Sequence, residues 1–172
     1  MPTIKKLLID DYGVVIKDNS YELKLWDNDK GYLFKPSANY IKGYQGIKLS
    51  NILQNKADYA NMHLLAECLY KDTNMISVYC NHHYRPADID DMESVTGLNE
   101  RHTKEFINRM IIIGVIAKVN ILCNECLVTQ YHVNPLYFTT NKYLSPALYM
   151  MFKKQLDGVL KPWIIARFNN KE

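Results

Sequence analysis

The segment from Asp88 to Asn134, DIDDMESVTGLNERHTKEFINRMIIIGVIAKVNILCNECLVTQYHVN, decides the fold that this sequence predicts. Apolar residues at helical spacing indicate two helices, which Gly97 and Leu98 join through a tight turn. Asn99 is a favourable N-cap for the second helix, because its side-chain oxygen can accept a hydrogen bond from a free backbone N–H. The first half of the segment therefore predicts a helix-turn-helix.

A β-hairpin is expected directly after the second helix, which ends at Gly114. Strands are predicted over residues 115–122 and 127–134, with a turn at 123–126 and a stop at Pro135. A helix-turn-helix followed by a hairpin is a winged helix. Its usual role is to place the second helix in the DNA major groove, with the hairpin (the wing) on the DNA backbone.

Residues 1–49 are predicted to be a β-rich extension of this core. Short apolar or alternating runs over residues 4–35 indicate a meander of three or four strands, with turns at 10–11, 18–19 and 28–31. Its aromatic residues form either the core face of an ordinary sheet or a face for a partner. These residues are Tyr12, Tyr21, Trp26, Tyr32 and Phe34.

Residues 50–135 form the predicted winged-helix core. Its first helix is expected at about 57–70, where apolar residues follow one stripe. A short strand is expected at 75–79, beside the hairpin, and Pro86 opens the helix-turn-helix. Together with its flanking regions, the core predicts an α+β fold.

Residues 136–172 are predicted to be a C-terminal helical segment, with a helix at about 145–156 and a short helix at 162–168. An apolar stripe on the first of these helices is expected to form a homodimer interface, because symmetric dimers match paired DNA half-sites. The alternative is a monomer in which the N-terminal sheet covers this stripe. The stripe comprises Leu144, Leu148, Met151, Phe152 and Leu156.

Three stretches carry a resemblance to a known group of proteins: NRMIIIGVIAKV (108–119), YHVNPLYF (131–138) and KYLSPALYMMFKKQL (142–156). They resemble winged-helix proteins of plasmids and phages in low-GC Gram-positive bacteria, a group that includes plasmid replication initiators and MarR-like regulators. The resemblance covers roughly residues 88–156. It implies a non-catalytic DNA-binding protein of a mobile element, acting in transcription regulation or replication.

Candidate DNA-binding side chains lie on the second helix and on the wing. Arg and Asn make bidentate contacts to base edges, whereas Lys and His more often contact phosphates. Helical spacing assigns the apolar positions of this helix to the core and leaves its polar positions for double-stranded DNA. The candidates are Asn99, Arg101, His102, Lys104, Asn108 and Arg109, with Lys118 on the wing.

Acidic residues at the start of the first helix, Asp88, Asp90, Asp91 and Glu93, count against this interpretation, because they repel phosphates. Glu125 at the wing tip adds a further negative charge. An alternative is therefore a phage accessory protein that binds and inhibits a host protein, such as a defence nuclease, with the winged helix as its scaffold.

The composition sets limits on the class of protein. The chain has 172 residues, of which 48% are hydrophobic, and a net charge of +3, which supports DNA binding only weakly. No apolar run approaches the roughly 18 residues of a membrane span, and the N-terminus lacks a signal core. Four cysteines without a signal peptide favour reduced thiols in a cytoplasm.

The cysteines and histidines allow two interpretations. Cys123 and Cys126 have CxxC spacing at the wing tip, and Cys80, His82 and His83 could approach them to hold zinc. The other interpretation is a hairpin with free thiols. Only Cys123 and Cys126 have the spacing of a complete zinc-binding pair, whereas Cys80, His82 and His83 do not. We therefore expect no metal and no cofactor.

Evidence for catalysis is thin. The paired carboxylates Asp10–Asp11 lie at a predicted turn, and those after Asp88 cap a helix. The sequence contains no Gly-rich phosphate loop, HExxH motif or nucleophile elbow. We therefore predict that the protein is not an enzyme.

Overall fold

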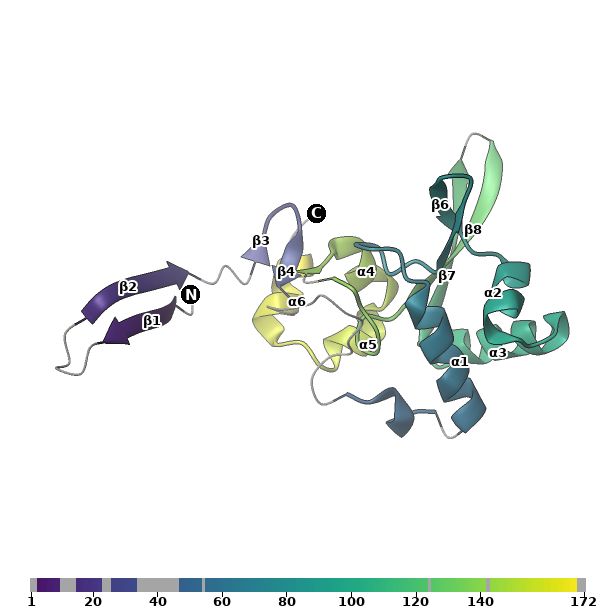
Figure 1. Cartoon of the computed structure of the whole chain (residues 1–172), viewed down its shortest axis with the longest axis horizontal. Coiled ribbons are helices and arrows are strands. Elements are labelled where there is room, and N and C mark those ends of the chain that lie inside the picture. The colour runs from purple at the N-terminus through teal and green to yellow at the C-terminus, as the bar shows by residue number, and fades with distance from the viewer. Residues whose placement is uncertain are drawn as a thin grey trace.

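The computed structural model describes residues 3–9, 15–22, 26–33, 47–53, 55–123, 125–141 and 143–169, and its fold is α+β, as predicted (Figure 1). The strands are β1 (Thr3–Ile9), β2 (Val15–Glu22), β3 (Trp26–Asp27), β4 (Gly31–Leu33), β5 (Ser77–Cys80), β6 (His83–Pro86), β7 (Ile116–Cys123), β8 (Cys126–Val133) and β9 (Tyr143–Leu144). The helices are η1 (Leu49–Asn51), α1 (Lys56–Glu67), α2 (Ile89–Thr96), α3 (Glu100–Ile112), α4 (Pro146–Met151), α5 (Lys153–Asp157) and α6 (Pro162–Asn169).

The central segment has the predicted order of two helices and a hairpin. A reciprocal capping box between Asp88 and Asp91 starts α2, and Gly97, with a φ of 70°, ends it. Asn99 caps α3 by accepting a hydrogen bond from the His102 N–H. Strands β7 and β8 then pair antiparallel over their whole length. The local capping residues thus place these elements close to their predicted bounds.

The strand expected at 75–79 divides its pairing between two neighbours. Its first part lies along β8, where the Ile76 N–H donates to the Tyr131 carbonyl and the Val133 N–H donates to the Asn74 carbonyl, both at 2.8 Å. From Ser77 onward it is β5, which forms a hairpin with β6. This second hairpin was not predicted.

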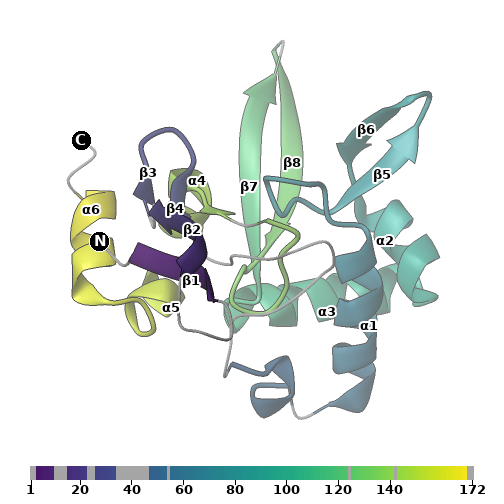
Figure 2. The ribbon, with the colours of Figure 1, turned by 60° about the vertical axis from the view of Figure 1, so that its left-hand side comes forward.

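Figures 1 and 2 show the β5–β6 and β7–β8 hairpins projecting from the same side of the molecule, with α1, α2 and α3 at their base. Helices α4, α5 and α6 lie on the other side of β7–β8, together with β3 and β4.

The predicted N-terminal meander is wrong. Strands β1 and β2 form a sheet of their own, and Figure 1 shows this hairpin extending away from the other elements. Asp18 and Asn19, expected at a turn, lie within β2 opposite Leu7 and Lys6. Strand β4 pairs with both β3 and β9 and so joins the N-terminal region to the C-terminal one. Local turn signals could not reveal a pairing between strands so distant in sequence.

The apolar stripe assigned to a dimer interface lies inside one chain instead. Met151 of this stripe is partly buried against the core. The other four residues belong to the buried core: Leu144, Leu148, Phe152 and Leu156. The Phe168 ring of α6 stacks on Tyr149 at 4.2 Å and meets Trp26 of β3 edge-on at 4.8 Å. Because the stripe is buried within one chain, the interface prediction for these residues is corrected.

The long helix expected at 145–156 is divided into α4 and α5. Phe152 lies between them with φ −119° and ψ 24°, outside the helical region. Among the residues that the structure describes, no helix has the length and apolar character that crossing a bilayer requires.

Because Phe152 is buried within the chain, we expect Phe152→Ala to lower the free energy of unfolding by about 3–5 kcal/mol. Met150→Ala on α4, where Met150 is 64% exposed, is the matched control, with an expected change of about 0.5 kcal/mol or less. Urea unfolding followed by circular dichroism measures both. A stable Phe152→Ala variant whose mass in light scattering is half that of the wild type would restore the interface interpretation.

Candidate functional site

Helix α3 presents one apolar and one polar face. Its buried residues are Thr103, Phe106, Ile107 and Met110. Arg101, His102, Lys104 and Asn108 are exposed, as their helical spacing predicts. This exposed face of α3 is the candidate nucleic-acid interface.

The charges on this face are partly balanced. The Arg101 Nε donates to the Glu105 carboxylate at 2.9 Å, and Lys104 forms an ion pair with Glu100. These hydrogen bonds lower the pKa values of both glutamates, which therefore stay ionised at neutral pH. Exposed pairs four residues apart on a helix contribute little to stability. Both basic side chains can consequently move to a phosphate at little cost.

Arg109 has a structural role that the sequence analysis missed. Its Nη2 lies 2.8 Å from Oδ1 of Asp58 on α1, and its Nε donates to Oδ2 of the same carboxylate at 3.2 Å. Asp58 is only 7% exposed, so this bidentate pair compensates a buried charge. The carboxylate also raises the pKa of Arg109. Arg109 therefore joins α3 to α1 and is not available to DNA without breaking this contact.

Asn99 is likewise engaged within the fold. Its side-chain oxygen accepts the His102 N–H at 3.0 Å, which satisfies the free donor at the start of α3. Of the seven residues predicted to bind DNA, the structure thus leaves five exposed and without a structural role: Arg101, His102, Lys104, Asn108 and Lys118.

The acidic start of α2 is partly neutralised by Arg85. Its guanidinium makes two hydrogen bonds to Asp91, at 2.7 and 2.8 Å, and lies 3.5 Å from Asp88. Burial raises the pKa of Asp91, but hydrogen bonds from the Asp88 N–H and from Arg85 outweigh it and lower the pKa overall. Asp90 remains exposed, so this end of α2 still repels phosphates.

The wing offers little positive charge. Lys118 is exposed on β7, and two exposed leucines lie nearer the tip. Leu122 is 72% exposed and Leu127 67%, and the two face each other across the hairpin. A DNA backbone gains nothing from such side chains, whereas a protein surface does.

The two thiols at the end of the β7–β8 hairpin lie side by side. Cys123 and Cys126 are opposite each other at the end of the hairpin, and both are exposed. Within the described part of the chain, no three His, Cys, Asp or Glu side chains gather at a point where they could hold a metal. Asp10 and Asp11 lie outside the described residues.

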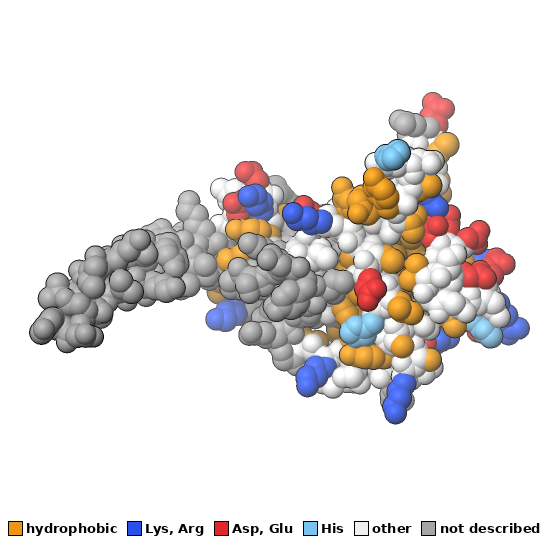
Figure 3. All heavy atoms as spheres, viewed as in Figure 1, with side chains coloured by type: hydrophobic (Ala, Val, Ile, Leu, Met, Phe, Trp, Pro, Cys, Tyr) orange, Lys and Arg blue, Asp and Glu red, His pale blue; other side chains and the backbone are white. Residues whose placement is uncertain are grey.

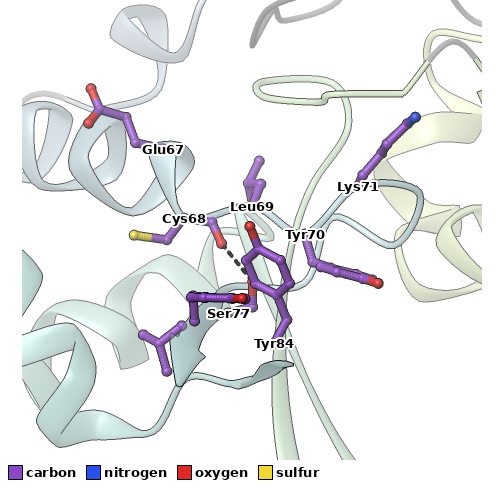
Figure 4. Close-up of a pocket in the computed structure, with 9 residues that line it drawn as sticks. Glu67, Cys68, Leu69, Tyr70, Lys71, Ser77 and Tyr84 are labelled. Carbon is purple, nitrogen blue, oxygen red and sulfur yellow. Dashed lines mark hydrogen bonds between the residues drawn. The ribbon is translucent and has the colours of Figure 1, made fainter. Parts of the chain in front are cut away.

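A hollow of about 550 Å³ lies between the end of α1 and the β5–β6 hairpin. Figure 4 shows Tyr70 and Tyr84 beside it, with Cys68, Leu69 and Ser77 on the neighbouring backbone. The sequence analysis did not anticipate this hollow, because it did not predict the β5–β6 hairpin.

No protein-family model, curated protein or solved structure matches this chain.

We expect Arg109→Ala to lower the free energy of unfolding by about 1–3 kcal/mol, because it leaves the Asp58 charge buried without a partner. Arg101→Ala is the matched control, with an expected change of about 0.5 kcal/mol or less, because Arg101 is exposed. Urea unfolding measures both. If the double variant Asp58→Ala/Arg109→Ala shows a strictly additive destabilisation, the two side chains are not coupled.

We expect no stoichiometric zinc in the purified protein, because the wing supplies only two of the four ligands that a structural site requires. Elemental analysis measures the metal content. One zinc per chain, released by Cys123→Ser, would contradict this expectation.

Proposed function

We propose that this protein is a winged-helix DNA-binding protein of a mobile element, acting without catalysis as a transcriptional regulator or replication-associated factor. The order of its elements supports the proposal: α1, an extended segment at 74–76 that bonds to β8, the β5–β6 hairpin, α2, α3 and then β7–β8. The observation that carries it is the exposed face of α3, with Arg101, His102, Lys104 and Asn108 directed away from the core.

In this proposal α3 enters the major groove. Arg101 and Asn108 are suited to base edges, whereas His102, Lys104 and Lys118 are suited to phosphates. Glu100 and Glu105 share the face, so the attraction to generic duplex DNA is modest. The first turn of α2, with Asp90 exposed, faces away from the backbone when the protein is docked.

A second candidate is a phage accessory protein that binds and inhibits a host protein. The apolar wing tip favours it, since Leu122 and Leu127 are far more exposed than most leucines and suit a protein surface. Absence of duplex binding at low salt would favour this second function over the first.

We expect weak, salt-sensitive binding of generic duplex DNA. Arg101→Ala with Lys104→Ala should weaken it by about 1–3 kcal/mol for each specific interaction with DNA that the substitutions remove. Fluorescence anisotropy of a labelled duplex at several salt concentrations measures the affinity. Lys154→Ala with Lys161→Ala is the matched control, because it removes the same charge from exposed sites outside α3. Equal affinity of the wild type and the Arg101/Lys104 variant would remove α3 from the interface.

A further inference from the structure

Among the described strands, none pairs with the outer edge of β5 in the β5–β6 hairpin. Asn81 and His82 form its two-residue turn, with φ values of 50° and 66° that suit a type I′ turn. Along an antiparallel ladder, residue pairs that are joined by backbone hydrogen bonds alternate with pairs that are not. Ile76 and Ala87 form a joined pair, because the Ala87 N–H donates to the Ile76 carbonyl. The even-numbered residues from Ile76 to Cys80 therefore form hydrogen bonds with the β6 side. The backbone N–H and carbonyl of Tyr79 point to the opposite edge of β5, away from β6.

This opposite edge is covered only at its start. The Tyr70 N–H donates to the Met75 carbonyl at 2.8 Å, and the Ser77 N–H donates to the Cys68 carbonyl at 2.9 Å. The covering segment begins where α1 ends, at Glu67, so it does not extend along the rest of β5. Among the described residues, the Tyr79 N–H and carbonyl have no backbone partner.

The hollow lies directly beside this free edge. Its apolar lining comes from Leu69, Val78 and three tyrosines. The Tyr84 ring centroid lies 5.2 Å from that of Tyr70 and 5.0 Å from that of Tyr79. Tyr79 is 63% exposed and Tyr84 57%, and Figure 3 shows hydrophobic side chains gathered near this hairpin.

We propose that the free edge of β5 and this hollow bind an extended segment of a partner protein, which adds to β5 as a further strand. Its backbone would satisfy the Tyr79 N–H and carbonyl, and one aliphatic or aromatic side chain would enter the hollow between the tyrosines. The part of this edge beyond Ser77, from Val78 to Cys80, accommodates about three residues in extended form. This site contains no residue of α3, so it goes beyond the proposed DNA binding.

The charges at the hollow favour a peptide over a nucleic acid. Stacked bases would also suit exposed tyrosines, but a bound strand of nucleic acid requires positive charge along its phosphates. Here Glu67 and Lys71 both line the hollow and offset each other, and Figure 4 shows both side chains extending away from the tyrosine rings. An added β-strand needs no net charge, and its backbone groups match what Tyr79 offers.

A second copy of this chain fits less well. If two β5 edges paired with each other, the partner's Tyr79 would be the residue nearest the hollow. That ring already packs on Tyr84 within its own hairpin. A separate extended segment, with a side chain free to enter the hollow, meets both requirements of the site.

Selection of random linear peptides displayed on phage against the immobilised full chain tests this proposal. The probes are the enriched peptides, synthesised with a fluorescent label and measured by anisotropy. Tyr79→Pro removes the N–H at the free edge without removing a hydrogen bond to β6, and Tyr79→Ala removes the ring but keeps the N–H. We expect the peptides to bind Tyr79→Pro at least about tenfold more weakly than Tyr79→Ala. A loss of this size corresponds to one to two hydrogen bonds.

A second measurement does not depend on the folding of the proline variant. Peptide binding to the wild type should slow hydrogen exchange of the Tyr79 amide, which has no backbone partner within the part of the chain that the structure describes. Met150→Ala, on α4, is the control and should change the peptide affinity less than about twofold, because Met150 is exposed and does not line the hollow.

Several results would overturn the proposal. They are the absence of any enriched peptide, unchanged exchange of the Tyr79 amide on peptide binding, and loss of binding in Met150→Ala. A doubled mass in light scattering that Tyr79→Pro abolishes would identify a second copy as the occupant. Binding of oligothymidine that Tyr84→Ala abolishes would identify a nucleic acid instead.

Discussion

Two buried asparagines fix the strand on which the rest of the structure depends. At the end of β8, the Asn134 side chain donates to the Gly114 carbonyl and accepts the Leu136 N–H, while its own backbone N–H donates to the Val115 carbonyl. Asn74, in the left-handed region with φ 53°, donates from Nδ2 to the carbonyls of Val133 and Phe138. Because unpaired polar groups are costly in a core, these bonds hold the end of α3, the strand at 74–76 and the C-terminal region in one arrangement.

The parts of the fold that could be predicted from sequence are those with local causes. Capping by Asp88 and Asn99 and the left-handed glycines at 97 and 114 act within a few residues, so they placed α2, α3 and the start of the wing. The β4–β9 pairing and the contacts of Asn74 join residues far apart in the chain, and no local pattern records them. The same limit explains why the C-terminal stripe was assigned to a dimer.

In the candidate site, too, features with local causes could be predicted from sequence and long-range contacts could not. Helical spacing correctly left Arg101, Lys104 and Asn108 exposed, because exposure on an amphipathic helix follows from its own periodicity. It failed for Arg109, whose partner Asp58 lies 51 residues earlier, on α1. An exposed arginine and one that neutralises a buried carboxylate have the same helical position, and only the neighbouring helix distinguishes them.

The balance of charge on α3 bears on how the protein would select DNA. Phosphate contacts give affinity without sequence information, and here Glu100 and Glu105 reduce the general attraction to phosphates. Contacts to base edges act over a short range, so Glu100 and Glu105 weaken them less than they weaken contacts to phosphates. A helix with this composition therefore gains relatively more from a matching base sequence than from duplex DNA in general. When the attraction to generic DNA is weak, a protein partner can contribute part of the affinity. The exposed apolar residues of the two hairpins lie outside α3. A partner bound to these residues would leave α3 accessible to DNA.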